Sequence, residues 1–464
     1  SRRLLSLAVS FFAFLLAPSA ADRRRGVEFF RGVDMAFKKM IKEDTPQDRH
    51  FDPYRRPRTE KAHRLVADVL NQLQNMEKHH AALKRKRKPS EQTVFEQRVT
   101  AVISDAAHRW LTDKQGDARV AVPYSNRELS QAGRYRSPVL RQKLRDVIQK
   151  LASPQMSFLE FQLGYFYPFG TNRQSTIKAG KRLITRIEEL ELSPNDFTSD
   201  LTQEVIILKR TKEGFFDTGE WIEYDDTGVT GKYREEMRRI NDWLAEADIH
   251  VVPEFAALHN LDASNRVLRR HFNNNSFELG GRLFGGFWQT MKKELRPKCI
   301  RINGEPIVTL DYSQMNPRLL YAKAGLTPPE GDMYAIPGWS HWRAGLKKVF
   351  SSMLNVDKPL ARFPSETKQL FHRKAKIKDI VSAIVDFHKP VSHYFFTRVG
   401  LELMFRESQI LVDILLQLQE MNIVALPIHD AVVVAQSEAD KVQTVMVETF
   451  RKHTGLEGMV DREG

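Results

Sequence analysis

Two short runs of branched, largely apolar residues that each lead to an aspartate constrain this chain most. Residues 307–310 end on Asp311. Much later, residues 423–428 and 431–434 form two such runs, and Asp430 lies in the tight turn between them. Runs of this length and composition predict buried strands, so the second pair predicts a hairpin with Asp430 at its tip. The chain is therefore expected to form a sheet with carboxylates at its strand ends.

Two carboxylates brought together in one sheet repel each other unless cations lie between them. Magnesium usually binds one or two protein carboxylates together with substrate phosphates. Asp311 and Asp430 are therefore candidate ligands for two Mg²⁺ ions, with Mn²⁺ as an alternative, in a site for two-metal phosphoryl transfer. Either aspartate taken alone is more simply explained as the end of a strand at a turn.

The composition indicates an acidic polymer as the partner. Of 464 residues, 72 are Lys or Arg and 58 are Asp or Glu, which gives a formal net charge of +14. An excess of this size favours nucleic acid. The chain has one cysteine, Cys299, so an intrachain disulfide is excluded, which suits a reducing compartment.

The residues around both aspartates resemble motifs of family A DNA polymerases. Motif A of that family runs Asp-Tyr-Ser-Gln-Ile-Glu-Leu-Arg, and most of its positions recur here as Asp311-Tyr312-Ser313-Gln314 followed by Arg318. The pair His429 and Asp430 resembles motif C of the same family.

Three further segments resemble the family in the same order along the chain. Upstream, Glu278-x-x-Gly281-Arg282 resembles an element that contacts template and duplex. The stretch 331–334 resembles the segment that follows motif A. Arg343 and Lys347 have the Arg-x3-Lys spacing of motif B, which on a helix places both cations on one face.

The resemblance implies an α+β fold in which residues 301–464 form the palm of a right-hand polymerase. The palm is expected to be an antiparallel sheet, and a helical insertion at about 321–400 is expected to form the fingers. It implies a DNA polymerase that adds nucleotides from nucleoside triphosphates to a primer on a DNA template, with RNA as an alternative partner. Asp311 and Asp430 would hold the metals, and Lys347 and Arg343 would bind phosphate as further catalytic residues. The residues expected to contact nucleotide or primer are Tyr312, Ser313, Gln314, Phe350 and His429, and Arg282 is expected to contact nucleic acid.

Three positions depart from the family pattern. Asn316 replaces the glutamate that helps these enzymes exclude ribonucleotides, Ala431 replaces the glutamate after motif C, and Asn355 stands where RNA polymerases carry a tyrosine. The choice of sugar is therefore open, and a single-subunit-type RNA polymerase or a primase is an alternative. A catalytically inactive DNA-binding replication or regulatory protein is another. No acidic cluster indicates a 3′–5′ exonuclease, so proofreading is not expected.

Residues 96–190 resemble a winged-helix DNA-binding domain. A capped helix start at 124–129 precedes a basic amphipathic helix at 140–151, and the alternating stretch 158–167 predicts a hairpin that returns toward Ile177. In that family the second helix enters the major groove and the wing touches the backbone. The residues expected to contact DNA are Arg141, Lys143, Arg145 and Arg173. The same periodicity is typical of other small helical domains.

The remaining segments complete the predicted domain organisation. Residues 1–95 are expected to form a basic N-terminal extension, whose run 84–88 is either a solvated face or a phosphate-binding arm. Residues 191–300 are expected to form a thumb-like connecting region, in which Arg269 and Arg270 belong to a basic cluster that contacts nucleic acid.

The first residues give a conflicting indication of location. Arg2 and Arg3 precede the apolar run 4–17 and then a stretch of small residues, which is the layout of a secretory signal peptide. The run is short for a membrane span, and a buried helix is the alternative. Because the rest of the sequence indicates work on nucleic acid, we expect a cytoplasmic protein with no membrane partner.

Overall fold

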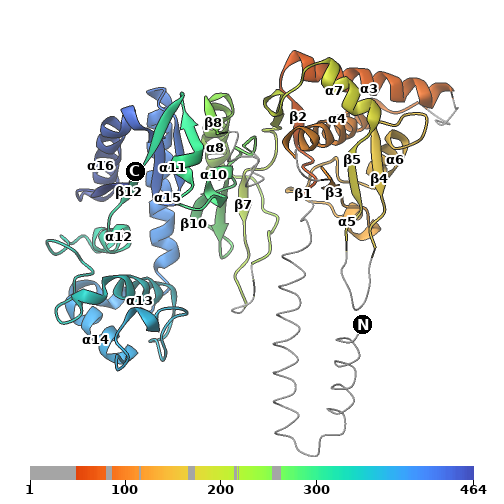
Figure 1. Ribbon diagram of the computed structural model, residues 1–464. Coiled ribbons are helices and arrows are strands. Elements are labelled where there is room, and N and C mark those ends of the chain that lie inside the picture. The colour runs from red at the N-terminus through yellow and green to blue at the C-terminus, as the bar shows by residue number, and fades with distance from the viewer. Residues whose placement is uncertain are drawn as a thin grey trace, which may run out of the picture.

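The computed structural model describes residues 49–79, 86–113, 117–165, 173–213, 217, 219–252 and 263–463. Within these ranges the fold is mixed α+β, with two hydrophobic cores that follow each other along the sequence (Figure 1). The first core extends from Phe51 to Phe197 and the second from Val205 to Phe450. The signal-like run 4–17 lies outside the described residues. No helix in the described ranges is long and apolar enough to cross a bilayer.

One sheet of the second core carries the strand ends with Asp311 and Asp430. In order of pairing its strands are β13 (Ala425–Ile428), β14 (Ala431–Ala435), β12 (Glu305–Tyr312), β11 (Ile300–Ile302) and β8 (Ile249–Val251), and β15 (Val460–Glu463) also pairs with β12. All these pairings are antiparallel. β14 is buried along its whole length, because α15 (Gly400–Glu420) and α16 (Ala439–Thr454) pack against this sheet. The predicted strand at 307–310 and the hairpin at 423–434 are confirmed.

A second sheet brings Arg282 to α15. β10 (Ser276–Phe284) pairs antiparallel with β9 (Arg269–Asn273), which pairs in parallel with β7 (Ile206–Leu208). Gly281 lies at a shift in the β9–β10 register with a φ of 81°, and a Cβ there would stand 2.6 Å from the hydroxyl oxygen of Ser408 on α15. Only glycine combines that conformation with so close an approach.

The second core also contains further helices. They are α8 (Gly228–Glu246), α10 (Phe287–Thr290), α11 (Arg296–Cys299), α12 (Met315–Ala324), α13 (Arg343–Asn355) and α14 (Ile377–Phe387). The segment expected to be helical, at about 321–400, contains the end of α12 together with α13 and α14, with irregular stretches between them, and α13 and α14 lie together near one end of α15 (Figure 1). Because β8 pairs with β11 inside this core, the expected boundary near residue 300 falls within one packing unit.

The first core is built around α4 (Pro89–Thr112), which is buried on nearly all sides along its second half. Around it lie α3 (Glu60–His79), α5 (Asn126–Ser130), α6 (Lys143–Leu151) and α7 (Lys181–Glu189). A sheet of β1 (Arg49–His50), β3 (Val120–Ala121), β5 (Thr176–Ala179) and β4 (Leu159–Gln162) completes it, and β2 (Arg55–Pro57) pairs with β6 (Phe197–Ser199).

Two expectations for this region change. The boundary at residue 95 is wrong, because it falls inside α4 and because α3 already packs in the same core as α4. The capped helix start is confirmed, since the Ser125 hydroxyl accepts a hydrogen bond from the backbone N–H of Glu128 at 3.2 Å. β4 and β5 pair as the expected hairpin, while the winged-helix interpretation stays a prediction.

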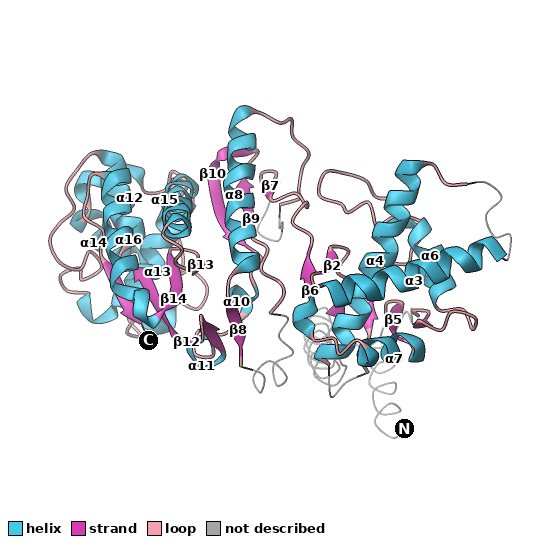
Figure 2. Cartoon of the chain, turned by 90° about the horizontal axis from the view of Figure 1, so that it is seen from above, coloured by secondary structure: helices cyan, strands magenta, loops and turns pink. Residues whose placement is uncertain are grey.

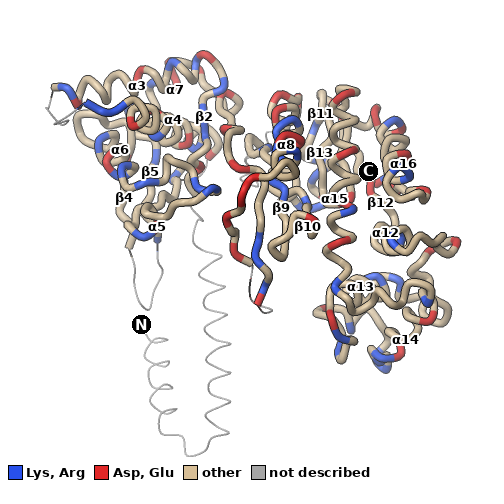
Figure 3. The backbone as a smooth tube through the Cα atoms, turned by 180° about the vertical axis from the view of Figure 1, so that it is seen from behind, with Lys and Arg blue, Asp and Glu red and all other residues tan. Residues whose placement is uncertain are grey.

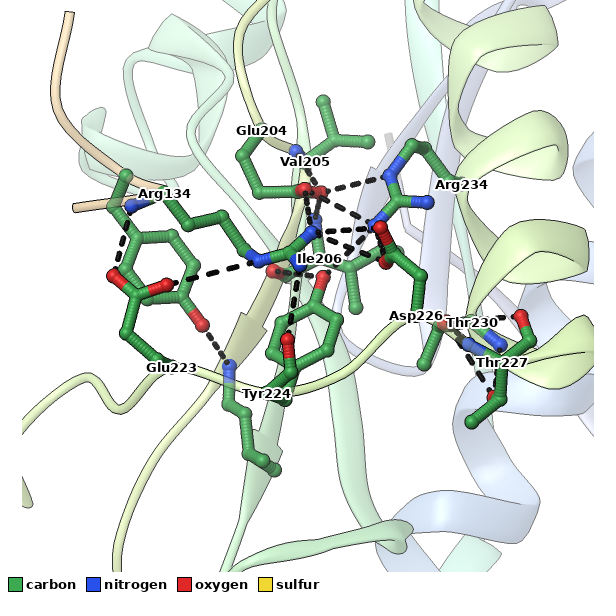
Figure 4. Close-up of polar contacts among 12 residues, drawn as sticks. Arg134, Glu204, Val205, Ile206, Glu223, Tyr224, Asp226, Thr227, Thr230 and Arg234 are labelled. Atoms are coloured by element: carbon green, nitrogen blue, oxygen red, sulfur yellow. Dashed lines mark hydrogen bonds and ion pairs between the residues drawn. The ribbon is translucent and has the colours of Figure 1, made fainter.

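A cluster of ion pairs joins residues on both sides of the boundary between the cores (Figure 4). The Glu204 carboxylate accepts hydrogen bonds from Arg134, which follows α5, and from Arg234 on α8, each at about 3.1 Å. Both guanidinium groups also contact Asp226. Seen from above, α8, β9 and β10 lie between the elements of the first core, called the N-terminal unit below, and the sheet that contains β12 (Figure 2).

Candidate active site

The register of β12 and β14 brings Asp311 and Asp430 to neighbouring strand ends. Asp311 is paired with Ala431 across the two strands, and Asp430 precedes Ala431 in the turn. His429, the first residue of this two-residue turn, has a φ of 58°. A positive φ at that position suits the tight turns that close antiparallel hairpins. The turn therefore holds one carboxylate next to the strand that carries the other.

The Asp311 carboxyl group lies in an electrostatically unfavourable place. Burial, followed by repulsion from Asp430 and Glu463, raises its pKa to about 6, although the Lys347 ammonium acts in the opposite direction. Its Oδ1 atom is buried and has no hydrogen-bond partner among the described residues. A buried carboxylate oxygen normally has a donor or a cation beside it. The arrangement therefore leaves a ligand atom for a cation.

Two cations on α13 belong to this region. Arg343 and Lys347 are both exposed and lie one helical turn apart, on the same face of α13. The guanidinium of Arg343 pairs with the Asp332 carboxylate, which raises the pKa of Arg343, and it lies 5.5 Å from the centre of the Tyr334 ring. Arg343 is thus held by an anion at one edge of the site, while Lys347 is close enough to lower the pKa of Asp311.

Arg282 approaches the site from β10 and is fixed by Glu407 on α15. Its Nε and Nη2 atoms donate to the two oxygens of Glu407 at 2.6 and 2.9 Å. The Glu407 side chain is 1% exposed, and burial raises its pKa against the attraction of Arg282. Burial alone would lower the pKa of Arg282, but Glu407 and, less strongly, Asp430 raise it. The guanidinium therefore lies within the electrostatic reach of Asp430.

Sequence reasoning missed three carboxylates near Asp311 and Asp430: Glu407, Asp461 and Glu463. Asp461 is the β15 residue opposite Asp311, and Glu463 is opposite Thr309, so both belong to the face of the sheet that carries Asp311. Lys293 forms an ion pair with Glu463 at 2.5 Å. The β15 segment is charged and exposed and has no apolar pattern, so nothing in the sequence marks it as a strand. Its place beside Asp311 is visible only in the strand pairing of the structure.

Several residues predicted to contact nucleotide lie in the core instead. Tyr312 is 6% exposed and its hydroxyl donates to the Met446 carbonyl at 2.6 Å, because alternation along β12 directs it away from the face of Asp311. Phe350 is 1% exposed and packs against Tyr334. These two predictions are wrong, since burial against other side chains leaves no surface for a ligand.

The other residues near motif A and motif C support the local structure. Gln314 is 6% exposed, and its side-chain oxygen accepts a hydrogen bond from the backbone N–H of Met333 at 2.8 Å, so the predicted nucleotide contact of Gln314 stays a prediction. The backbone N–H of Ser313 donates to the Met459 carbonyl at 2.8 Å. Partial burial and the neighbouring Arg282 guanidinium lower the pKa of His429, which lies in the turn beside Asp430.

The basic pair on β9 is also placed differently from the expectation. Arg270 is fully buried, and it donates to the Gly281 carbonyl and to the Ser408 hydroxyl, each at 3.1 Å. The prediction that Arg270 contacts nucleic acid is therefore wrong, because the residue joins β9, β10 and α15. Arg269 is half-buried and donates to the side chain of Gln203.

The four residues of the first core that are expected to contact DNA lie on α6, just before α6 and on the β4–β5 hairpin. Lys143 and Arg145 are on α6, where the Arg145 guanidinium stands 5.0 Å from the centre of the Tyr124 ring. Arg141 precedes α6 and donates to the Gln131 carbonyl. Arg173 lies on the β4–β5 hairpin, where its backbone pairs with Tyr165. Contact of these residues with DNA stays a prediction.

No protein-family model matches this chain, and no curated protein matches it. Among solved structures, the chain is similar to the polymerase domain of Pol1 from M. smegmatis, which was determined with a DNA primer-template and dNTP. That match covers 55% of this chain and 57% of that chain, with 13% sequence identity and a TM-score of 0.26. A likeness of this degree carries no argument about the function of this chain.

Proposed function

We propose that this protein is a template-directed nucleic-acid polymerase that extends a primer by two-metal nucleotidyl transfer. The observation that carries the proposal is the pairing of Asp311 and Asp430 at neighbouring strand ends, with an orphaned buried oxygen on Asp311. A structural aspartate at the end of a strand normally has its oxygens satisfied. A carboxyl group with a strongly raised pKa beside a second carboxylate is typical of a functional site.

The residues present fit magnesium. In the described ranges no three His, Cys, Asp or Glu side chains are arranged to hold a metal ion together. Magnesium does not need such a group, because it is commonly bound by one or two carboxylates together with substrate phosphates and water. Asp311 and Asp430 would hold the ions, which would lower the pKa of an attacking hydroxyl and neutralise charge on the phosphates.

The cations around the site suit a triphosphate. The reaction is in-line attack of a primer 3′-hydroxyl on the α-phosphate, which forms a phosphodiester bond and releases pyrophosphate. Lys347 and Arg343, on one face of α13, would bind the phosphates and stabilise the charge that develops on them. Arg282, held by Glu407 beside Asp430, would contact the nucleic-acid backbone.

Within this class of enzyme, the specific activity that we propose is DNA synthesis without proofreading. It rests on the resemblance to family A DNA polymerases around Asp311, and Asn316 and Ala431 leave the sugar preference as the property to be measured. A DNA-binding protein without catalytic activity would need neither a divalent ion nor the orphaned carboxylate oxygen.

Primer extension tests the proposal. The protein is incubated with a templated hairpin primer and Mg²⁺, with four dNTPs in one series and four rNTPs in another. We expect extension by the parent and a loss of at least about a hundredfold for Lys347→Ala, since removal of one donor to a developing charge costs about that much. Asp311→Asn and Asp430→Asn are expected to show no extension.

Lys348→Ala is the matched control, because Lys348 is the neighbouring exposed lysine on α13 and lies about 100° around the helix from Lys347. Its extension rate should equal that of the parent. Extension that persists in Asp311→Asn, or a parent that binds the hairpin without magnesium and never extends it, would refute the proposal.

A further inference from the structure

A basic cavity lies in the N-terminal unit, lined wholly by residues other than those of the candidate active site. It has a volume of about 530 Å³ and opens between the segment that leads into α4, the start of α4 and one face of α6. Its cationic lining residues are Lys86, Arg87, Lys88, Arg98, Lys143 and Lys150, against the two carboxylates of Glu91 and Asp146. In Figure 3 a basic stretch that leads into α4 lies between α3 and α6.

One wall of the basic cavity is held in place by a buried carboxylate. The Glu77 side chain, which is 1% exposed, accepts hydrogen bonds from Arg87 at 2.8 and 2.7 Å and from Lys150 at 2.6 Å. The Arg87 guanidinium also covers the ring of Phe95, at 3.7 Å from its centre. A single carboxylate cannot neutralise two cations, so this wall keeps a positive charge on a rigid support.

The solvent-facing side of the basic cavity carries lysines that are less strongly paired with carboxylates than Arg87 and Lys150 are. Lys86 and Lys88 form no ion pair within the part of the chain that the structure describes. Lys143 reaches Glu91 at 3.5 Å, and both side chains are about half exposed or more, so this pair contributes little. The positive end of the α4 dipole points to the same place, because α4 begins at Pro89.

These features select the chemistry of the ligand. The two apolar lining residues, Phe95 and Val147, are buried, and Arg87 covers the Phe95 ring, so neither offers a surface for a base or an acyl chain. The volume exceeds that of one phosphate group, and Lys86, Lys88 and Lys143 reach it from two separate elements. Cations distributed in this way match successive phosphates of a strand, which is how proteins bind a nucleic-acid backbone without reading its sequence.

We propose that the basic cavity is a second nucleic-acid site, which binds the phosphodiester backbone of a strand independently of the candidate active site. It would keep the protein on nucleic acid through contacts that need neither a divalent ion nor a nucleotide. The inference goes beyond the proposed catalytic activity and does not depend on it.

Binding of a short fluorescent oligonucleotide to the full chain, in EDTA and without nucleotide, tests the inference. The variant Lys86→Glu/Lys88→Glu/Lys143→Glu is compared with the parent over a range of salt concentrations by fluorescence anisotropy. For a single strand each phosphate contact contributes about 0.7 to the slope of log K against log salt, so loss of three contacts should reduce the slope by about 2. The affinity at moderate salt should fall about tenfold or more.

The matched control is Lys61→Glu/Arg64→Glu/Lys181→Glu, which makes the same change in charge at exposed positions near the start of α3 and on α7. Its slope should stay close to that of the parent. An equal loss in both variants would assign the effect to overall charge and overturn the inference, as would an unchanged slope in the cavity variant.

Two further arms keep the result interpretable. If charge reversal disturbs folding, seen by circular dichroism, Lys86→Ala/Lys88→Ala/Lys143→Ala replaces it and should still lower the slope by about 2. The inference is tested by oligonucleotide binding in EDTA and the polymerase proposal by primer extension with Mg²⁺, so failure of the polymerase proposal and failure of this inference give different results. A cavity that binds inorganic phosphate in a variant-sensitive way, with no effect on oligonucleotide binding, would also overturn the inference.

Discussion

Replacement of Asp311 by asparagine should stabilise the protein in the absence of metal. Burial and the neighbouring carboxylates raise the pKa of Asp311 from 3.8 to about 6, so the ionised form is disfavoured in the folded state. A difference of this size corresponds to at most about 3 kcal/mol in the free energy of unfolding. Because the carboxyl group is only partly buried, solvent screening reduces the expected gain to about 1–2 kcal/mol.

The sign of this effect depends on pH. A carboxyl group whose pKa is raised on folding destabilises the folded state once it ionises. The penalty is therefore absent below about pH 4, grows as the pH rises toward 6, and is constant above that. Asp311→Asn removes the penalty, so the parent and the variant should have equal stability near pH 4 and should differ fully at pH 7.5.

Thermal and urea unfolding at these two pH values, in EDTA, measure the difference. At pH 7.5 the variant should melt about 2–6 °C higher than the parent. Addition of Mg²⁺ should stabilise the parent more than the variant, since the variant has lost one of the two metal ligands. Asp242→Asn, which alters an exposed carboxylate on α8, is the control for the loss of one charge. A variant less stable than the parent at pH 7.5 would refute the electrostatic account of the site.

Substitutions at three other residues test contacts around the site and between the cores. Glu407→Ala leaves Arg282 without its buried partner and should lower stability by about 3–5 kcal/mol in urea unfolding, whereas Glu407→Gln, which keeps the shape, should cost less. Glu204→Ala should cost about 2–4 kcal/mol by the same measurement, because two guanidinium groups lose their shared acceptor. Asp332→Asn should release Arg343 for phosphate and lower the KM for nucleotide about two- to fivefold in primer extension, since an exposed ion pair is worth about 0.5–1 kcal/mol.

The sequence was sufficient for the parts of the fold that are locally encoded. Branched apolar runs predicted β12 and the β13–β14 hairpin, and the periodicity of apolar residues predicted α6. These signals work because one face of each element must be buried. The same reasoning failed for Tyr312 and Phe350, since a motif gives the identity of a residue and not the direction in which its side chain points.

Features that depend on contacts between distant segments could not be predicted. Glu407 is separated from Arg282 by more than a hundred residues, and nothing in either segment identifies the partner. β15 has no apolar pattern, so the approach of Asp461 to Asp311 follows only from strand pairing. The N-terminal boundary was misplaced for a related reason, because the polar surface of α3 concealed its buried stripe.

The raised pKa of Asp311 also fixes how activity should depend on pH and magnesium. Below about pH 6 a proton competes with the cation for the carboxylate, so the rate of primer extension at limiting Mg²⁺ should fall about tenfold for each further pH unit. The midpoint of this pH profile is the pH at which the extension rate is half its maximum. A tenfold increase in Mg²⁺ should move this midpoint down by about one pH unit, because proton and metal bind the same oxygens. Asp430→Glu keeps the second carboxylate but shifts its charge, and should change the midpoint as well as the rate. A midpoint that does not move with Mg²⁺ would show that another group limits the reaction, and Asp311 would then lose its place as the metal ligand.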